Sequence, residues 1–174
     1  MSSSNTNTKQ LLITVGTTKF DALIASIDTP EFYATAIKHN FNKILIQKGT
    51  GSYIPSAYSS VSHAINVEVA TILPNFENVI ANSALVISHG GAGIILECLK
   101  HKKKVIVCVN AALMDNHQVE LASALDASNY VKYCTQLENI HSVVDAVLSG
   151  EVVINDYPPF NYTAIPNVIY DMIK

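Results

Sequence analysis

Two short stretches of the sequence combine residue types that could bind a phosphorylated ligand. The first, VISHGGAGIILE at residues 86–97, runs from an apolar segment through three glycines into an apolar helical pattern. Glycines remove side chains, so a diphosphate can approach the backbone closely. The start of a helix carries partial positive charge and amide groups without partners, which favours anions. The predicted anion site consists of Ser88, His89, Gly90, Gly91, Ala92 and Gly93.

Glu97 is the one acid of this helical pattern, and it follows Gly93 at the i+4 position. Residues four apart share a helix face, so two interpretations are open. Glu97 could be exposed and pair with His101, which is also at i+4. Alternatively, its carboxylate could accept hydrogen bonds from the vicinal hydroxyls of a ribose, about one helical turn below the phosphates. His89 is either a polar turn residue or a donor to a phosphate.

The second stretch, VNAALMDNHQ at residues 109–118, begins as a loop and becomes a helix near Asp115, which is a natural cap. Its polar residues offer both donors and acceptors, as recognition of a sugar requires. The alternative is an ordinary polar helix cap and first turn. A metal held by His89 and His117 is disfavoured, and no metal is expected. The candidate sugar-binding residues are Asp115, Asn116, His117 and Gln118.

A third, weaker signal is Gly16-Thr17-Thr18 after the first apolar run. Its amide and hydroxyl groups could contact a phosphate, but on its own it favours a turn with a helix N-cap at Thr17 or Thr18. The later glycines of the dinucleotide fingerprint are missing. The second apolar run ends in Gln47-Lys48-Gly49, without the acid that a nicotinamide-binding fold needs there. A nicotinamide oxidoreductase is therefore disfavoured.

These stretches need a scaffold, and the chain alternates short apolar runs with helical patterns. Such alternation predicts an α/β fold, a Rossmann-like parallel sheet with helices on both faces, which binds ligands at the carboxyl ends of its strands. Residues 1–10 are expected to be flexible, 11–150 to form the domain and 151–174 to form a tail that could dock on a partner, chiefly through 165–173. Strands are expected at 11–15, 44–46, 65–71, 85–87, 105–109 and 131–134. Helices are expected around 20–40, 75–83, 92–101, 116–127 and 137–149, and a loop at 49–63.

The composition fits one globular domain of 174 residues, with 49% hydrophobic and 14% charged residues. The net charge of -3, without a basic stripe, argues against nucleic acid as a partner. Three widely spaced cysteines, Cys98, Cys108 and Cys134, predict buried, inert thiols in a reducing compartment. The first ten residues lack an apolar signal core, and no apolar run reaches the ~20 residues that span a bilayer. A cytoplasmic protein is expected.

The HGGAG turn, its helix with an acid, and the later strand followed by DNHQ resemble the nucleotide-sugar-binding half of family-28-type glycosyltransferases, which have the GT-B fold. Within that family, VGTTKFDALI at 15–24 and the short chain are similar to the donor-binding catalytic subunit of two-subunit UDP-N-acetylglucosamine transferases. Those enzymes act on N-acetylglucosaminyl-diphosphodolichol in N-glycan precursor synthesis. The resemblance covers roughly residues 11–135 and implies a single GT-B half-domain.

The resemblance also implies roles for the residues named above. Gly16, Thr17 and Thr18 would face the acceptor side and the diphosphate, and residues 88–93 would hold the diphosphate of UDP-N-acetylglucosamine. Glu97 would accept the ribose hydroxyls, and residues 115–118 would contact the sugar, with His117 and Gln118 the closest matches to the family pattern. His89 and His117 are the candidate catalytic side chains, although neither is identified as the general base.

The family inverts the anomeric centre and needs no obligatory metal or other cofactor, which is the expectation here. Because a GT-B enzyme has a second, acceptor-binding half, the resemblance implies a heterodimer with a membrane-anchored subunit. That partner would bring the chain to a lipid-linked acceptor at the cytosolic face of the endoplasmic reticulum. Two alternatives stay open: a subunit of a bacterial split glycosyltransferase for lipid-linked polysaccharide, and a non-catalytic nucleotide-sugar-binding module.

Overall fold

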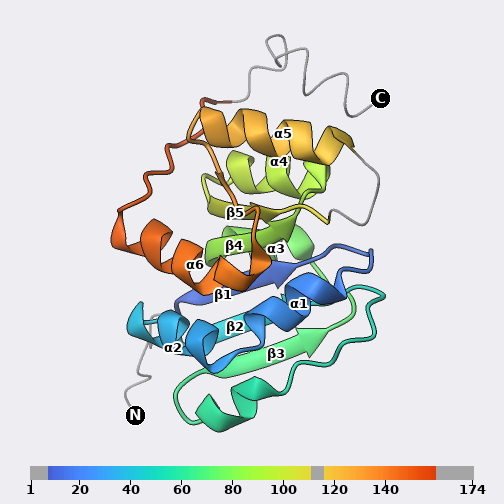
Figure 1. Cartoon of the computed structure of the whole chain (residues 1–174), viewed down its shortest axis with the longest axis vertical. Coiled ribbons are helices and arrows are strands. Elements are labelled where there is room, and N and C mark those ends of the chain that lie inside the picture. The colour runs from blue at the N-terminus through green and yellow to red at the C-terminus, as the bar shows by residue number, and fades with distance from the viewer. Residues whose placement is uncertain (1–7, 111–115, 160–174) are drawn as a thin grey trace.

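The described part of the chain is built around one parallel sheet (Figure 1). The computed structural model describes residues 8–110 and 116–159. The strand order is β3-β2-β1-β4-β5-β6, and every neighbouring pair is parallel. This confirms the predicted Rossmann-like fold, with all six strands near their expected positions. The strands are β1 (Gln10–Thr14), β2 (Lys43–Gln47), β3 (Asn66–Ala70), β4 (Ser83–His89), β5 (Lys104–Cys108) and β6 (Lys132–Tyr133).

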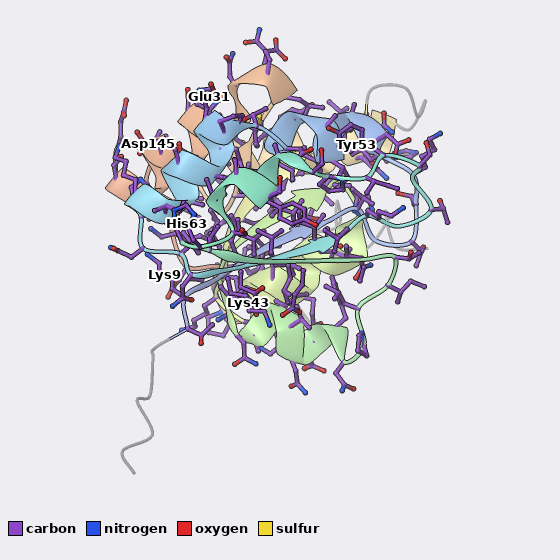
Figure 2. All side chains as sticks on the ribbon, turned by 90° about the horizontal axis from the view of Figure 1, so that it is seen from below. Lys9, Glu31, Lys43, Tyr53, His63 and Asp145 are labelled. Carbon is purple, nitrogen blue, oxygen red and sulfur yellow. The ribbon has the colours of Figure 1, made fainter. Side chains whose placement is uncertain are left out.

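Apolar side chains cover both faces of the sheet, because successive residues of a strand point to opposite sides. Leu11 and Ile13 of β1 join one buried cluster, whereas Leu12 between them joins the other. The first cluster is covered by α1 (Asp21–Ile27), α2 (Pro30–Lys38) and α6 (Ile140–Ser149). The second is covered by α3 (Phe76–Ala81), α4 (Ala92–Lys100) and α5 (Asn116–Ala127). Figure 2 shows these two helical layers from the edge of the sheet.

The helix expected around 20–40 is in fact two helices, so that prediction was wrong in its extent. α1 ends at Ile27, and α2 begins at Pro30, whose ring cannot continue the preceding helix but suits a first turn. The Thr29 hydroxyl caps α2 by accepting from the Phe32 N–H at 3.2 Å. The N-cap expected at Thr17 or Thr18 was also wrong, because α1 has Phe20 as its N-cap.

The loop expected at 49–63 contains a short 3-10 helix, η1 (Ala57–Val61). Two carboxylates, Asp21 at the start of α1 and Asp28 just after its end, accept hydrogen bonds from this loop. Asp21 accepts hydrogen bonds from the Tyr53 N–H and from Ser52, which hold the pKa of this carboxyl at about 2. Buried Asp28 accepts from the Tyr33 and Tyr53 hydroxyls at 3.2 and 3.0 Å. It also accepts from the N–H groups of Ser56 and Ala57 at 2.8 and 2.9 Å.

The first part of the expected tail packs on the domain. Val152 and Ile154 contact the first cluster and Tyr157 contacts the second, so residues 151–159 pass from one layer to the other. The rings of Tyr157 and Tyr130 are 4.8 Å apart, edge to face. Residues 160–174, with the proposed docking segment 165–173, lie outside the described residues, so docking stays a prediction. Within residues 8–110 and 116–159, none of the helices has the length and apolar character needed to cross a bilayer.

Replacing Asp28 with alanine should destabilise the fold markedly. The change would leave two tyrosine hydroxyls and two backbone N–H groups without their acceptor, at a cost of about 2–4 kcal/mol in the free energy of unfolding. Urea unfolding of both proteins measures the difference. Asp156→Ala is the control, since Asp156 is exposed and its contact with Lys102 is a loose, exposed ion pair at 3.8 Å. Equal losses in the two variants would contradict the role given to Asp28.

Candidate functional site

The predicted binding edge lies where the strand order reverses. The chain proceeds from β1 to β2 and β3 on one side, then returns to β4 on the other side of β1. Thr14, at the end of β1, is in register with Ser88 near the end of β4. The loops after these strands therefore diverge at neighbouring points of one edge, which is where ligands bind in open parallel sheets.

A cavity of about 420 Å³ occupies this position, a volume that suits a small-molecule ligand. Its walls come from the loops after β1 and β3, from the end of β2, from the start of α3 and from the junction of β4 with α4. It joins six residues that the sequence singled out with five that it did not. The lining residues are Gly16, Thr17, Thr18, Gln47, Ile72, Leu73, Phe76, His89, Gly91, Gly93 and Ile94.

The imidazole of His89 lies between two glycines in the floor of this cavity. A Cβ atom built on Gly16 would be 2.9 Å from His89 Cε1, and one built on Gly91 would be 2.5 Å from Nε2. Both distances are closer than side-chain atoms allow, so a side chain at either position would force the imidazole or the turn to shift. Gly16 also has a φ of +63°, which favours glycine over any residue with a side chain. The close contact brings the β1 and β4 turns together.

The N-terminus of α4 opens on the cavity without a side-chain cap. Its N-cap is Gly91, which makes no capping hydrogen bond, so amide groups of the first turn are available to a ligand. Gly93, one residue into the helix, has no atom within 4 Å of the position that a Cβ would occupy. Open space, uncapped amides and the positive end of the helix dipole coincide here, an arrangement that suits an anion.

Among the described residues that line the cavity, His89 is the one ionisable side chain. Burial lowers its pKa, with a smaller opposing effect from the Thr14 backbone, so the ring is neutral near pH 7. Its Nδ1 atom is buried and has no hydrogen-bond partner within the described ranges. The chain also contains no arginine. An anion in this cavity would therefore be held mainly by backbone amides and the helix dipole.

The second polar stretch meets the glycine turn at one point. A Cβ on Gly90 would lie 2.9 Å from Gln118 Cβ, 3.0 Å from Gln118 Oε1 and 3.1 Å from Val109 Cγ2. Gln118 is on the first turn of α5, so Gly90 allows this helix to pack directly against the turn that leads into α4. The two motifs, 28 residues apart in the chain, are thus neighbours in space.

Comparison with known proteins agrees with this geometry. The family described as "Glycosyltransferase family 28 C-terminal domain" matches residues 10–155. This chain belongs to that family.

Relatives of this family 28 domain include the proteins named "UDP-N-acetylglucosamine transferase subunit ALG13". The Homo sapiens protein is 37% identical over 127 residues, which are 73% of this chain but 11% of that protein. This chain thus spans only a small part of the human relative. The Yarrowia lipolytica protein is 32% identical over 164 residues, covering 94% of this chain and 84% of that protein.

Two solved structures share the fold. The NMR solution structure of ALG13 superimposes with a TM-score of 0.69 and 23% identity, covering 96% of this chain and 98% of that one. The crystal structure of Acinetobacter baumannii MurG gives a TM-score of 0.61 at 13% identity, with 99% of this chain matching 47% of that one. The family 28 domain therefore corresponds to about half of that chain.

Two predicted binding residues of the family 28 domain, Ser88 and His117, do not line the cavity. The Ser88 hydroxyl is buried and donates to the His89 carbonyl at 2.7 Å, so it stabilises the turn. The His117 side chain is 77% exposed, with Nδ1 3.8 Å from Glu120. Asp115 and the side chain of Asn116 lie outside the described residues. The roles of residues 115–118 in contacting a sugar stay predictions.

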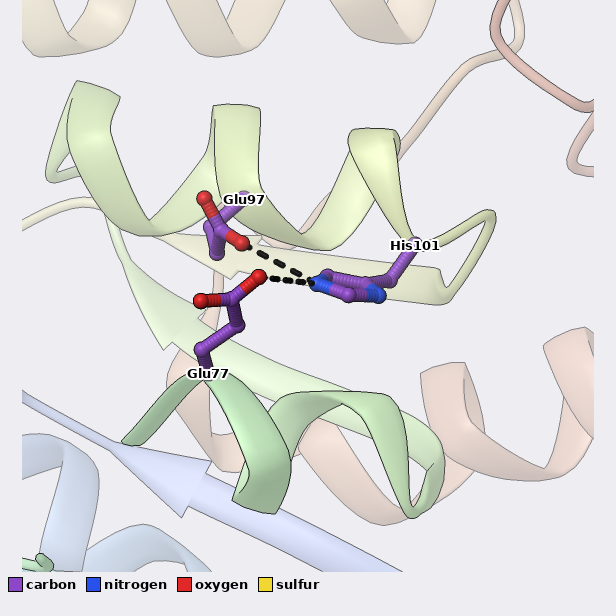
Figure 3. Close-up of side chains that lie close together, drawn as sticks. All are labelled: Glu77, Glu97 and His101. Carbon is purple, nitrogen blue, oxygen red and sulfur yellow. Dashed lines mark hydrogen bonds and ion pairs between the residues drawn. The ribbon is translucent and has the colours of Figure 1, made fainter. Parts of the chain in front are cut away.

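Glu97 makes the pairing that the first of its two interpretations requires. Its Oε1 atom is 3.0 Å from His101 Nε2 and 3.2 Å from Lys100 Nζ. Glu77 of α3 joins the group, 3.3 Å from Lys100. It is 3.4 Å from His101, as Figure 3 shows together with Glu97. Ligand atoms of the two glutamates and His101 lie within 4.8 Å of one another, but Lys100 occupies the same carboxylates. The group is an ion-pair network between α3 and α4, and a ribose contact by Glu97 stays a prediction.

Five lining residues were not found from the sequence: Gln47, Ile72, Leu73, Phe76 and Ile94. Four of them are apolar: Ile72, Leu73 and Phe76 follow β3, and Ile94 follows Gly93 in α4. Ile72 is 63% exposed. Apolar residues at the ends of strands resemble core residues in a sequence, so no local pattern distinguishes them. The one available signal was position, since Leu73 and Phe76 follow a strand at the binding edge.

Alanine at Gly90 and alanine at Gly93 should affect the stability of the fold differently. Gly90→Ala would force its Cβ against Gln118 and Val109 and should lower the free energy of unfolding by about 1–3 kcal/mol. Gly93→Ala enters open space in a helix and should leave stability unchanged or raise it by about 0.5 kcal/mol. Chemical denaturation of both variants measures this. Similar losses in both would contradict the packing described here.

Burial of His89 should make the fold sensitive to acid. Its pKa is lowered in the folded state, so the unfolded chain binds the proton more readily. The neutral ring contributes stability above the ordinary histidine pKa of about 6.5, and that contribution is lost as pH falls below it. From about pH 8 to pH 5, the free energy of unfolding should fall more steeply for the natural protein than for His89→Gln. The control is His63→Gln, at an exposed position, which should follow the natural profile. Parallel profiles for all three proteins would contradict the prediction.

Proposed function

We propose that this chain is the donor-binding catalytic subunit of a glycosyltransferase that moves N-acetylglucosamine from UDP-N-acetylglucosamine to N-acetylglucosaminyl-diphosphodolichol. The observation that carries the proposal is the uncapped N-terminus of α4, with open space at Gly93, facing the cavity at the β1–β4 edge. Membership of the glycosyltransferase 28 family and the names of the relatives supply the substrate class.

In this proposal the diphosphate lies at the start of α4, near Gly91 and Gly93. The base of the nucleotide would contact the apolar wall of Leu73 and Phe76, because the faces of its ring pack favourably against apolar side chains. The ribose between them would be close to Glu97, one turn along α4. The sugar would extend towards the first turn of α5, where Gln118 packs against Gly90.

The reaction follows from this placement. The acceptor hydroxyl attacks the anomeric carbon with inversion as UDP departs, and negative charge grows on the diphosphate. Amide groups and the dipole of α4 would stabilise that charge, because they are oriented towards the diphosphate before the reaction begins. Neutral His89 beside Gly16 and Gly91 would donate to the leaving group rather than take the acceptor's proton. A general base would therefore come from another part of the assembled enzyme.

A partner subunit completes the proposal. The name "subunit" of the relatives supports a heterodimer. A membrane-anchored acceptor-binding subunit would close the other side and bring the lipid-linked acceptor. The chain would then act at the cytosolic face of the endoplasmic reticulum. Mixing the chain with such a partner should give transfer to the lipid-linked acceptor, whereas the chain alone should give little or none.

Calorimetric titration with UDP-N-acetylglucosamine tests the donor site. Glu97→Ala should weaken binding about tenfold or more, because a carboxylate that accepts ribose hydroxyls contributes about 1.5–3 kcal/mol. His101→Ala removes the same ion pair but keeps the carboxylate, so it separates the two interpretations of Glu97. Glu151→Ala, at an exposed position after α6, is the matched control.

The natural protein, Glu151→Ala and His101→Ala should bind UDP-N-acetylglucosamine with the same affinity. Glu97→Ala should bind it clearly more weakly. Equal losses in Glu97→Ala and His101→Ala would show that the ion pair alone matters. NADH should not compete. Absence of UDP-N-acetylglucosamine binding, both by the chain and by the chain with its partner, would contradict the proposed function.

A further inference from the structure

Gln47 ends β2 at the cavity and connects two of its walls. The side chain is 4% exposed, and both ends of its amide are used. Nε2 donates to the Gly16 carbonyl at 2.9 Å, in the loop after β1. Oε1 accepts from the Leu73 N–H at 3.2 Å, in the loop after β3. One buried side chain thus holds the backbones of two loops that are 57 residues apart in the sequence.

Both loops form parts of the cavity that a ligand would contact. Gly16 is already fixed on its other side, where its N–H donates to the Thr14 hydroxyl at 3.0 Å, and it lies against His89. Leu73 belongs to the apolar wall with Phe76. The distance between the glycine floor and the apolar wall therefore depends on the Gln47 amide.

The chemistry of an amide explains why glutamine occupies this position. An amide donates and accepts at the same time, whereas an ionised carboxylate only accepts. In dinucleotide-binding sheets the end of this strand carries an acid that contacts the ribose. Here the side chain of the same strand end is directed to the protein backbone instead.

We propose that Gln47 is a positioning residue that sets the separation of the two cavity walls and thereby the affinity for a nucleoside diphosphate. The assignment of the ligand class depends on the proposed function. The strands themselves do not require this amide, because their pairing is made by backbone groups, such as the Val15 N–H to the Gln47 carbonyl at 3.1 Å. Loss of the amide should therefore affect the cavity more than the sheet.

The chain provides a matched control. Gln10 is also buried, at 7% exposure, and its Nε2 donates to Ser83 Oγ at 2.9 Å and to the Val79 carbonyl at 3.3 Å. It begins β1, at the end of the sheet opposite the cavity. Gln10→Met and Gln47→Met each remove one buried amide in exchange for a side chain of similar length. The two should lose stability alike, while only Gln47→Met changes the cavity.

The experiment measures UDP affinity by calorimetry and amide hydrogen exchange without ligand, in the full chain. Gln47→Met should weaken UDP binding about tenfold and raise exchange at Leu73, whereas Gln10→Met should change neither. Unchanged UDP affinity, or unchanged Leu73 exchange, in Gln47→Met would overturn the proposal. Natural protein that binds no UDP, either alone or with its partner, would instead contradict the proposed function, and Leu73 exchange would still report whether Gln47 orders the wall.

Gln47→Glu gives a readout that a merely structural role would not produce. The ionised carboxylate cannot donate to the Gly16 carbonyl, but a protonated one both donates and accepts, and burial raises a carboxyl pKa. The affinity loss relative to the natural protein at the same pH should shrink from about tenfold near pH 8 to about twofold near pH 5.5. Comparison at equal pH removes the titration of His89 and of the phosphates. A ratio that does not change with pH would overturn the proposal.

Discussion

The contact of His89 with Gly16 and Gly91 is the constraint on which the binding edge depends. Two adjacent parallel strands end side by side, and their turns can meet only if neither carries a Cβ towards the imidazole. The imidazole ring occupies that space. Gly91 on one side of the ring is the uncapped start of α4, and Gly16 on the other side lines the same cavity. A side chain at either glycine would separate the turns and displace the amides that face the cavity.

The rest of the domain holds these turns in place. Apolar clusters on both faces of the sheet fix the strand order, so the loops after β1, β2, β3 and β4 gather at one edge. Side chains then set the loops relative to one another: Asp28 holds the segment after β2, Gln118 packs on Gly90, and Gln47 joins two walls. The cavity is thus determined by a few specific contacts on a generic scaffold.

Local sequence was sufficient for the fold and for half of the cavity. Parallel strands covered on both faces appear as short apolar runs, and glycines mark the turns, so the sheet and Gly16, Gly91 and Gly93 were predictable. The break at Pro30 was a local signal that helical periodicity obscured. Gln47 and Leu73 could not be found, because their roles depend on which loops become neighbours. Glu97 shows a related limit: its i+4 pairing with His101 was one of the two sequence interpretations, but the contact of Glu77 with the same histidine depends on the packing of α3 on α4.

Under the proposed function, the start of α4 binds the diphosphate of a nucleotide. The most direct test is an NMR titration that follows backbone amides as UDP is added, with uridine as the comparison. We expect saturable shifts at Gly91, Ala92 and Gly93 with UDP, and much smaller ones with uridine, which lacks the diphosphate. Shifts of these three amides that are equal for both ligands, or UDP-induced shifts confined to other parts of the domain, would contradict it.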